Sequence, residues 1–289
     1  MKLYPTSALR NGAIDCALVA VLALSLASPA LADKPLWEAG IGIGAVTFPD
    51  YRGASHQTGY VVPAPYFVYR GEFFKADRNG LRGVLFDSDR VRLNMSLAAS
   101  LPVSSDKSDA RRGMPDLKPT IEFGPSLEIN LWQSADSRRK LDLRLPARAA
   151  FTVERSPRYV GVIASPNLNL DLLDPFGARG WNLGLLAGPI FADRRQHGYF
   201  YDVAPRHATD ARPEYRASGG YSGAQFISAV SKRFDKYWVG AFVRYDNLSG
   251  ATFVASPLVE KKSAWAGGFA ISWILGESAT RVADDDRSR

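Results

Sequence analysis

The sequence predicts an all-β protein: a transmembrane antiparallel β-barrel of about 12 strands that follows a cleaved signal peptide. Three observations lead to this prediction. Apolar and polar residues alternate over long segments, the number of such segments is even, and the connections between them are alternately short and long.

The clearest alternating segment is LDLRLPARAAFTVE, residues 141–154. Its odd positions are apolar from Leu141 to Val153, and its even positions include Asp142, Arg144 and Arg148, so one face of a strand is apolar and the other is charged. Soluble strands have roughly five or six residues, whereas a membrane strand needs about 9–11. A soluble sandwich could bury one such apolar row, but several long rows are hard to house in a soluble core. The same alternation recurs at 91–101, 121–131 and 160–172.

Twelve strands follow from the alternation, an even number as bacterial barrels require. We expect them at 36–47, 60–70, 72–77, 80–87, 90–101, 120–133, 140–153, 159–173, 181–193, 223–234, 237–247 and 263–275. With the N-terminus in the periplasm, the inward turns are short and most outward connections are long, which is the asymmetry of outer-membrane barrels. Aromatic residues near many strand ends are typical of interfacial girdles.

The first 32 residues are predicted to be a secretory signal peptide. Lys2 and Arg10 precede an apolar run at 17–27, and Ala30-Leu31-Ala32 forms a small-residue cleavage site. The barrel domain is expected at 33–275, without an internal linker, and a polar C-terminal tail at 276–289.

Charge and cysteine content exclude several kinds of function. The formal net charge is +7, and removal of Lys2, Arg10 and Asp15 with the signal peptide leaves +6. The basic residues form no run or basic helix, so we expect contact with the anionic headgroups of outer-membrane lipid or with acidic polymers, and no nucleic acid partner. The only cysteine is Cys16, within the signal peptide, so thiol chemistry and thiolate metal sites are excluded from the mature chain.

Candidate catalytic and ligand-binding residues are sparse. His56, His197 and His207 fall in predicted external loops or at a strand end, and we interpret them as exposed loop residues. Ser55 and His56 are neighbours, but adjacent side chains of an extended chain point apart, so they do not form a serine–histidine pair. We therefore expect no catalytic residues, no metal site and no cofactor.

The row of side chains that faces the predicted lumen is rich in charge. It includes Asp171 and the set proposed as a lumen charge network: Arg92, Glu122, Glu128, Asp142, Arg144, Arg148, Arg244 and Asp246. Two interpretations stay open, an ion-pair network that fills a narrow barrel and a polar conduit. A barrel of about 12 strands lies between filled eight-stranded barrels and open porins, and we favour a mostly filled lumen.

Motifs in the C-terminal third resemble those of a known family. Read in order, they are Tyr199-Phe200-Tyr201, Ala211-Arg212-Pro213-Glu214-Tyr215, Gly219-Gly220-Tyr221, Arg244-Tyr245-Asp246-Asn247-Leu248 and Ser256-Pro257-Leu258-Val259. This succession resembles the MltA-interacting protein (MipA) / OmpV family of Gram-negative outer-membrane proteins, and the N-terminal GIGIGAVTFPDYRGA is similar to the family's opening.

The resemblance implies a barrel in the cell outer membrane that is not an enzyme. It also implies a scaffold or interaction protein of the cell envelope, with a murein hydrolase and a peptidoglycan synthase as partners. A small-solute pore is the alternative, and a membrane-embedded hydrolase is a weaker one. Outer-membrane barrels commonly end in an aromatic residue that assists assembly. This sequence differs, because its last predicted strand ends in Trp273-Ile274-Leu275 and a polar tail follows.

The long outward connection at 194–222 is expected to fold over or into the barrel mouth. Its aromatic residues favour packing over disorder, and loops longer than about 12–15 residues are usually functional. Arg212, Glu214 and Tyr215 are the predicted loop anchors, with Arg212 and Glu214 binding charges of the lumen or rim.

Overall fold

The computed structural model describes residues 34–71, 74–77, 80–88 and 90–282 of the chain. The predicted signal peptide, the two central residues of the turn after Asp77 and the last seven residues lie outside the described residues.

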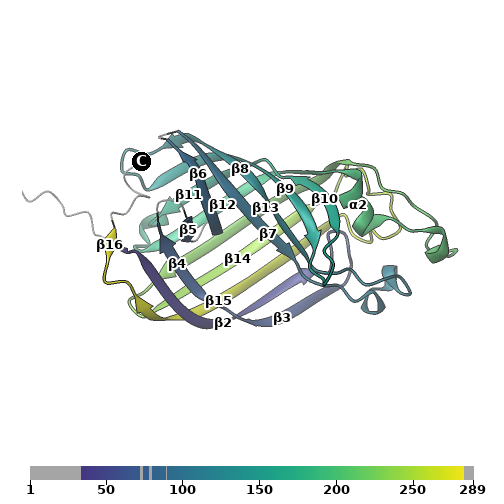
Figure 1. The fold of residues 1–289 in the computed structure, drawn as a ribbon, viewed down its shortest axis with the longest axis horizontal. Helices are drawn as coiled ribbons and strands as arrows, with labels where there is room; N and C mark the ends of the chain where they lie inside the picture. The colour runs from purple at the N-terminus through teal and green to yellow at the C-terminus, as the bar shows by residue number, and fades with distance from the viewer. Residues whose placement is uncertain (1–33, 72–73, 78–79, 89, 283–289) are drawn as a thin grey trace, which may run out of the picture.

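The described chain forms one barrel. The wall consists of the strands β2 (Trp37–Pro49), β3 (Gln57–Pro63), β4 (Tyr66–Arg70), β5 (Phe74–Asp77), β6 (Gly80–Asp87), β7 (Val91–Ser100), β8 (Thr120–Gln133), β9 (Arg139–Thr152), β10 (Tyr159–Ala164), β11 (Asn167–Leu173), β12 (Trp181–Ala192), β13 (Gly220–Arg233), β14 (Tyr237–Asn247) and β15 (Ser263–Glu277). Sequence neighbours pair antiparallel around the ring, β15 returns to pair with β2, and the ring of paired strands closes through β4, β5 and β6 (Figure 1).

Two of the predicted strands are interrupted, so fourteen segments build a wall of twelve strands. The predicted strand at 60–70 divides into β3 and β4 at Ala64-Pro65, and the one at 159–173 divides into β10 and β11 at Ser165-Pro166. Proline has no N–H to donate to the ladder, which explains both breaks. The prediction of about 12 antiparallel strands is confirmed.

The faces of the wall follow the alternation. Large apolar side chains point outward and remain exposed, for example Val61 at 74%, Phe269 at 64% and Leu275 at 74%. The alternate residues of the strands point into the lumen, and among them Asn94, Asp142 and Ser272 are buried. An exposed apolar belt around a polar interior is the arrangement that lipid requires, because lipid solvates the outer row and the lumen holds the polar row.

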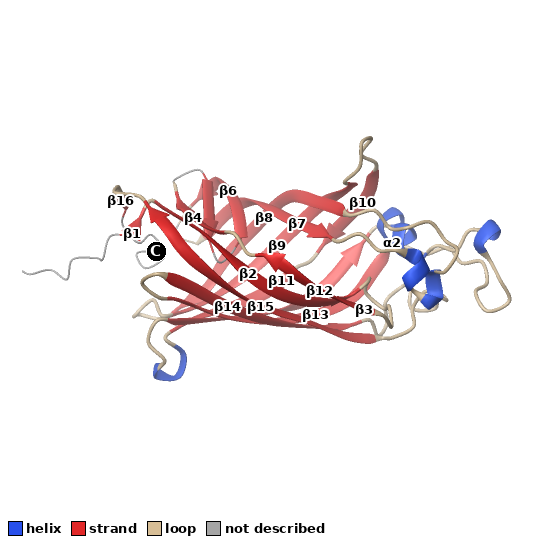
Figure 2. Cartoon of the chain, turned by 90° about the horizontal axis from the view of Figure 1, so that it is seen from below, coloured by secondary structure: helices blue, strands red, loops and turns tan. Residues whose placement is uncertain are grey.

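The two ends of the barrel differ. The two ends of the described chain and the short turns lie at one end of the barrel, which we assign to the periplasm, and the long connections lie at the other (Figure 1, Figure 2). β1 (Lys34–Pro35) pairs with β16 (Arg281–Val282) at the periplasmic end. The last wall strand runs to Glu277, two residues beyond the predicted boundary, and the described part of the predicted polar tail contributes the short strand β16.

The long connections carry the helices. α2 (Arg194–Tyr201) and the short helices η1 (Ser105–Lys107), η2 (Asp109–Arg111) and η4 (Pro205–His207) stand beyond the external rim, whereas η3 (Pro175–Gly177) forms a periplasmic turn. α2 was not expected from the sequence. Asp193 begins it as an N-cap, accepting a hydrogen bond from the Gln196 N–H at 2.8 Å. Among the described residues, no helix has the length and hydropathy to cross a bilayer.

Candidate functional site

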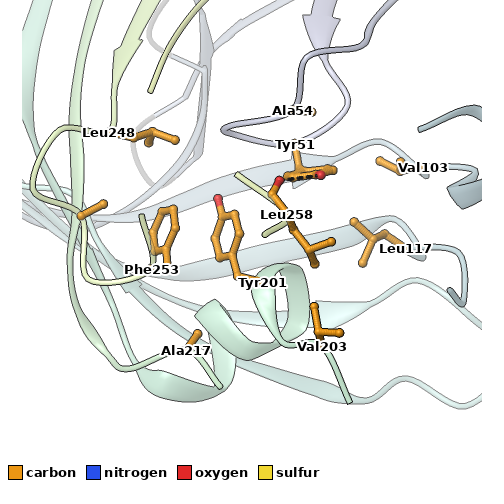
Figure 3. Packing of buried hydrophobic residues seen from close by; sticks show 11 residues of the cluster. Tyr51, Ala54, Val103, Leu117, Tyr201, Val203, Ala217, Leu248, Phe253 and Leu258 are labelled. Atoms are coloured by element: carbon orange, nitrogen blue, oxygen red, sulfur yellow. Dashed lines mark hydrogen bonds between the residues drawn. The ribbon is translucent and has the colours of Figure 1, made fainter. Parts of the chain in front are cut away.

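The external mouth of the barrel is covered by a cap, which we define as the connections 50–56, 102–119, 193–219 and 248–262. Their side chains build a hydrophobic core of their own outside the wall (Figure 3). The buried members are Tyr51, Ala54, Val103, Leu117, Tyr201, Val203, Ala217, Leu248, Ala251, Phe253 and Leu258. Because all four long connections contribute, the cap folds as a unit over the mouth.

Tyr201, the last residue of α2, lies at the centre of the cap. Its ring stacks on Phe253 with centroids 3.7 Å apart, and its hydroxyl donates to the Arg52 carbonyl at 2.7 Å. Tyr51 meets the Tyr201 ring edge-on and donates to the Leu258 carbonyl at 2.8 Å. Burial raises the pKa of Tyr51 to about 12 and also raises the pKa of Tyr201, so both hydroxyls stay protonated donors.

His197 joins the helix of the cap to the start of β13. Its Nδ1 lies 2.6 Å from the Ser218 carbonyl oxygen and its Nε2 lies 2.6 Å from the Ser222 hydroxyl. A carbonyl only accepts, so Nδ1 carries the proton and Nε2 accepts from Ser222. Burial lowers the pKa of His197 below its ordinary value, and the Arg52 guanidinium acts in the same direction. The expectation that His197 is an exposed loop residue is wrong: it is 2% exposed.

The His197–Ser222 pair has the tautomer that a serine–histidine catalyst uses, but its surroundings do not suit catalysis. Ser222 is 3% exposed, so its hydroxyl is closed off from a substrate. The imidazole is oriented by a backbone carbonyl and not by a carboxylate. The sequence neighbours Ser55 and His56 are a different pair of residues, and the His56 ring lies 3.0 Å from the Asp50 carboxylate.

Arg52 connects the cap to the barrel wall, a role that the sequence did not reveal. Its Nε lies 2.9 Å from Asp246 on β14, and its Nη1 donates to the Ser222 carbonyl at 2.7 Å. Arg244 binds the same carboxylate at 2.8 Å. Two arginines therefore share Asp246 beneath the cap.

The predicted loop anchors have partners other than those expected. Arg212 donates to the backbone carbonyls of His207, Ala110 and Arg112 at 2.8–3.0 Å, so it holds two cap connections together. Glu214 pairs with Arg216 of its own loop at 3.4 Å. The difference arises because the loop folds onto its neighbours and not into the lumen.

Tyr215 is the third of these residues. Its backbone forms an isolated bridge with Val203, and its hydroxyl donates to the Thr252 carbonyl at 3.4 Å. It therefore links the loop at 193–219 to the one at 248–262.

The lumen charge network forms two separate groups. Arg244 and Asp246 lie on β14 under the cap with Arg52. The other predicted members lie on β7, β8 and β9, where they form ion pairs along one strand and with neighbouring strands, β11 included. Arg148 lies 3.2 Å from Glu122, Arg92 lies 3.9 Å from Glu128, and Arg144 lies 3.9 Å from Asp142 and 3.5 Å from Asp171.

The opposite side of the lumen is mostly uncharged. The strands β2, β3 and β14 direct Val46, Phe48, Val62 and Phe242 inward by their alternation and register. The rings of Phe48 and Phe242 stack with centroids 6.2 Å apart. At the depth of these side chains, one wall of the lumen is charged and the facing wall is apolar. The charges on the facing wall, Arg244 and Asp246 of β14, lie farther out, under the cap.

The periplasmic end has its own charge cluster. Glu38 on β2 is 2% exposed and binds Arg70 at 2.8 Å and Arg233 at 2.9 Å. The Tyr66 hydroxyl donates to the same carboxylate at 3.2 Å. Arg233 also reaches Glu277 at 3.4 Å. These contacts join β2, β4, β13 and β15 across the inside of the barrel.

A periplasmic turn presents an aromatic ring to solvent. Phe176 lies in η3 between β11 and β12 and is 99% exposed. Asp174 and Phe176 have φ of 50° and 55°, in the left-handed region that non-glycine residues seldom occupy. The turn is held by hydrogen bonds to Asp174, including one from the Gly180 N–H at 2.5 Å. Figure 2 shows this helix at the end of the barrel where the termini lie.

The part of the chain that the structure describes contains no cluster of His, Cys, Asp or Glu with the arrangement of a metal site.

Comparison with known proteins gives consistent matches. The family model described as MltA-interacting protein MipA matches residues 41–275. Outer membrane protein OmpV of Vibrio cholerae serotype O1 and outer membrane protein Omp26La of Vibrio anguillarum are each 24% identical over 213 residues, which covers 72% of this chain and 76% of theirs.

Solved structures with a similar shape are more distant. The COG4313 outer membrane channel from Pseudomonas putida F1 aligns with a TM-score of 0.40 at 12% identity, over 86% of this chain and 99% of that one. A bacterial polysaccharide outer membrane secretin aligns with a TM-score of 0.39 at 10% identity, over 83% and 99%.

Proposed function

Because this outer-membrane chain belongs to the family of MltA-interacting protein MipA, we propose that it is a non-enzymatic scaffold of the cell envelope. In this proposal its periplasmic end binds a murein hydrolase of the MltA kind and, with it, a peptidoglycan synthase. The family description names the first partner. The second is an expectation from the family resemblance.

The observation that carries the proposal is the exposed Phe176. Large aromatic side chains are enriched among the few residues that dominate binding energy at protein interfaces. Full exposure of a phenylalanine is costly in water, and the strained backbone at Phe176 adds to that cost. A ring held outward on a structured periplasmic turn is suited to enter a pocket of a periplasmic partner.

The presence of the cap favours the scaffold hypothesis and argues against an open pore. The buried cap core crosses the mouth, and Arg52 ties it to Asp246 in the wall. A closed mouth restricts diffusion along the barrel axis and leaves the periplasmic turns as the accessible surface on the murein side.

The scaffold is tested by measuring binding of a purified MltA-type hydrolase to the protein in nanodiscs. The wild type should bind, and Phe176→Ser should weaken binding by about tenfold or more, as expected for an interface hot spot. Asp136→Ala, in the periplasmic turn between β8 and β9, is the matched control and should leave binding unchanged. An absence of wild-type binding would overturn the scaffold; equal binding by Phe176→Ser would overturn only the docking residue.

A small-solute conduit is the second candidate, and the charged wall built by β7, β8 and β9 favours it. The ion pairs on that wall offer a polar surface to a solute. The membrane-embedded hydrolase has weaker support, because the serine–histidine pair of the cap is buried.

A further inference from the structure

The barrel wall is incomplete in its external half, between β3 and β7. β3 pairs with β2 along Gln57–Pro63, and no described strand pairs with its other edge. β7 pairs with β8 as far as Ser100, but its described pairing with β6 ends at Met95. The cause is the shortness of the hairpin that separates them, since β5 has only four residues and pairs with β4 through two.

Hydrogen bonds identify the backbone groups along these open edges. The Ala64 N–H donates to the Gly42 carbonyl at 3.0 Å, so the even-numbered residues of β3 bond to β2. The odd-numbered residues then direct their backbone groups to the open side. Next to β7, the Asn130 N–H of β8 donates to the Arg90 carbonyl at 2.8 Å. The even-numbered residues of β7 therefore bond to β8, and its odd-numbered residues direct their backbone groups to the other side. The residues whose backbone faces the opening are Gln57, Gly59, Val61 and Pro63 on β3, and Leu97 and Ala99 on β7.

The opening lies at the depth of the outer leaflet. The Gln57 side chain donates to the carbonyl of Trp265, an outward aromatic residue near the external rim, at 3.3 Å. Pro63 pairs with Ile43, which pairs with Ile271 in the middle of β15. The open edge of β3 therefore runs from the interfacial level to the middle of the apolar belt. Figure 1 shows β3 in the half of the barrel that carries the long connections.

Unpaired backbone cannot face hydrocarbon, because each unsatisfied N–H or C=O costs several kcal/mol there. Such backbone is tolerated at membrane depth where it lines a water-filled cavity. Addition of a strand from a second chain would also satisfy it, but Pro63 has no N–H to offer and proline on an edge opposes strand addition. An opening that joins the lumen to the bilayer fits these constraints better.

The opening also lies where the two walls of the lumen meet. β3 belongs to the apolar wall and directs Val62 inward. β7 belongs to the polar wall and directs Asn94 and Ser96 inward, beside Arg148, which donates to Ser96 at 3.2 Å. Asn94 is 1% exposed, and neither polar atom of its side chain has a partner among the described residues. A guest at this seam meets apolar surface on one side and hydrogen-bonding groups on the other.

We propose that the gap between β3 and β7 is a lateral portal through which a single-chain amphiphile moves between the outer leaflet and the lumen. The apolar chain lies along Val62 and Phe242, and the polar head reaches Asn94 and the pair of Arg148 with Glu122. The cap closes the axial route from outside, and the Glu38 cluster narrows the periplasmic end, so the side is the accessible entrance. This inference is independent of the scaffold.

The test uses cysteine labelling from within the bilayer. Cys16 is the only native cysteine, so a Cys16→Ser background carries just one introduced thiol. Val61→Cys faces lipid, Val62→Cys faces the lumen at the portal, and Ile227→Cys faces the lumen from β13, which is paired on both sides. Each variant is reconstituted in liposomes with N-(1-pyrenyl)maleimide dissolved in the lipid and excess glutathione in the water to remove reagent that leaves the bilayer. Heat-modifiable migration confirms that each variant is folded.

The portal predicts that Val62→Cys reacts within about threefold of the rate of Val61→Cys, and that Ile227→Cys reacts at least about tenfold more slowly, because a paired wall excludes the reagent. Laurate added to the liposomes should slow Val62→Cys and leave Val61→Cys unchanged. Equally slow reaction of Val62→Cys and Ile227→Cys would overturn the portal. A dimer in which β3 pairs with a second copy of the chain would also overturn it, because the edge of β3 would then be covered. Fast reaction of Val62→Cys without an effect of laurate would overturn the amphiphile as its guest.

Discussion

The imidazole of His197 accepts a hydrogen bond from the hydroxyl of Ser222 across 2.6 Å, in a part of the cap where both side chains are buried. The pair connects α2, near the start of the 27-residue external connection at 193–219, to the beginning of β13, the wall strand that follows this connection. Gly161 on β10 makes room for the same helix, because a Cβ there would collide with Asp193 and Gln196. The cap is thus seated on the wall by specific contacts, and its stability can be tested separately from that of the barrel.

The closed cap should loosen in acid through His197. Burial holds its pKa below the value of about 6.5 that the imidazole has when the cap opens. The open state then binds more protons as pH falls through about 6.5, so the stability of the closed cap is complete above that pH and decreases below it. The charged neighbours of His197 have opposite effects on its pKa, since Arg52 lowers the pKa and Asp193 raises it. Hydrogen exchange at 194–217, corrected for intrinsic rates, should increase between about pH 7.5 and pH 5.5.

The control for this prediction is His197→Gln, which keeps a hydrogen-bonding side chain but does not titrate. Its exchange should lose most of the pH dependence. An equal pH dependence in both proteins would show that His197 is not the group that controls the opening of the cap.

Phe253→Ala should open the cap and spare the barrel. The ring is 1% exposed and contacts both Tyr201, at 3.7 Å, and His197, at 4.7 Å between centroids. Removal of a buried phenylalanine costs about 3–5 kcal/mol. Limited proteolysis should cut the connections at 193–219 and 248–262 faster, while heat-modifiable migration persists. Phe226→Ala removes a ring of the same size from the lipid face, where it is 43% exposed, and should leave the cap resistant.

Arg52→Ala should raise conductance. The guanidinium joins Asp246 of the wall to the Ser222 carbonyl beneath the cap, and its loss leaves the Asp246 carboxylate with Arg244 alone. In planar bilayers, the wild type should show little steady conductance and the variant should open more often. Arg216→Ala, which removes an exposed cap arginine that forms an ion pair with Glu214, is the control. A large, steady conductance in the wild type would promote the conduit over the scaffold.

Leu145→Arg should destabilise the barrel more than Ala98→Arg does. Leu145 is at the middle of β9 on the lipid face, 37% exposed, and an arginine at the bilayer midplane costs about 2–4 kcal/mol. Ala98 faces the lumen opposite Glu122, where a guanidinium has polar surroundings. Urea unfolding in lipid vesicles measures the two differences. Equal losses would mean that the faces of the wall are assigned incorrectly.

The alternation in the sequence determined the wall, because each lipid-facing side chain must be apolar and its neighbours must point the other way. The period of two alone therefore places Leu145 on the lipid face of its strand and Asp142 on the lumen face. The lumen positions of the charged residues followed from the same period. Even the unexpected helix has a local signal, the N-cap Asp193, although the motif is too short to stand out in a long loop.

Only the tertiary structure decided which charges meet and where the wall stops. Arg52 binds Asp246 across 194 positions of sequence, and nothing local to either residue encodes the partner. Arg212 binds backbone carbonyls and not the lumen or rim charges that were expected, because the external connections pack on one another and do not enter the lumen. The open edge at Val61 likewise depends on the register of several strands. The sequence shows that the hairpin of β5 and β6 is short, but only the pairing of its neighbours shows that one edge of β3 is left without a partner strand. Periodicity is a property of one segment, whereas closure, capping and opening are properties of segments brought together by folding.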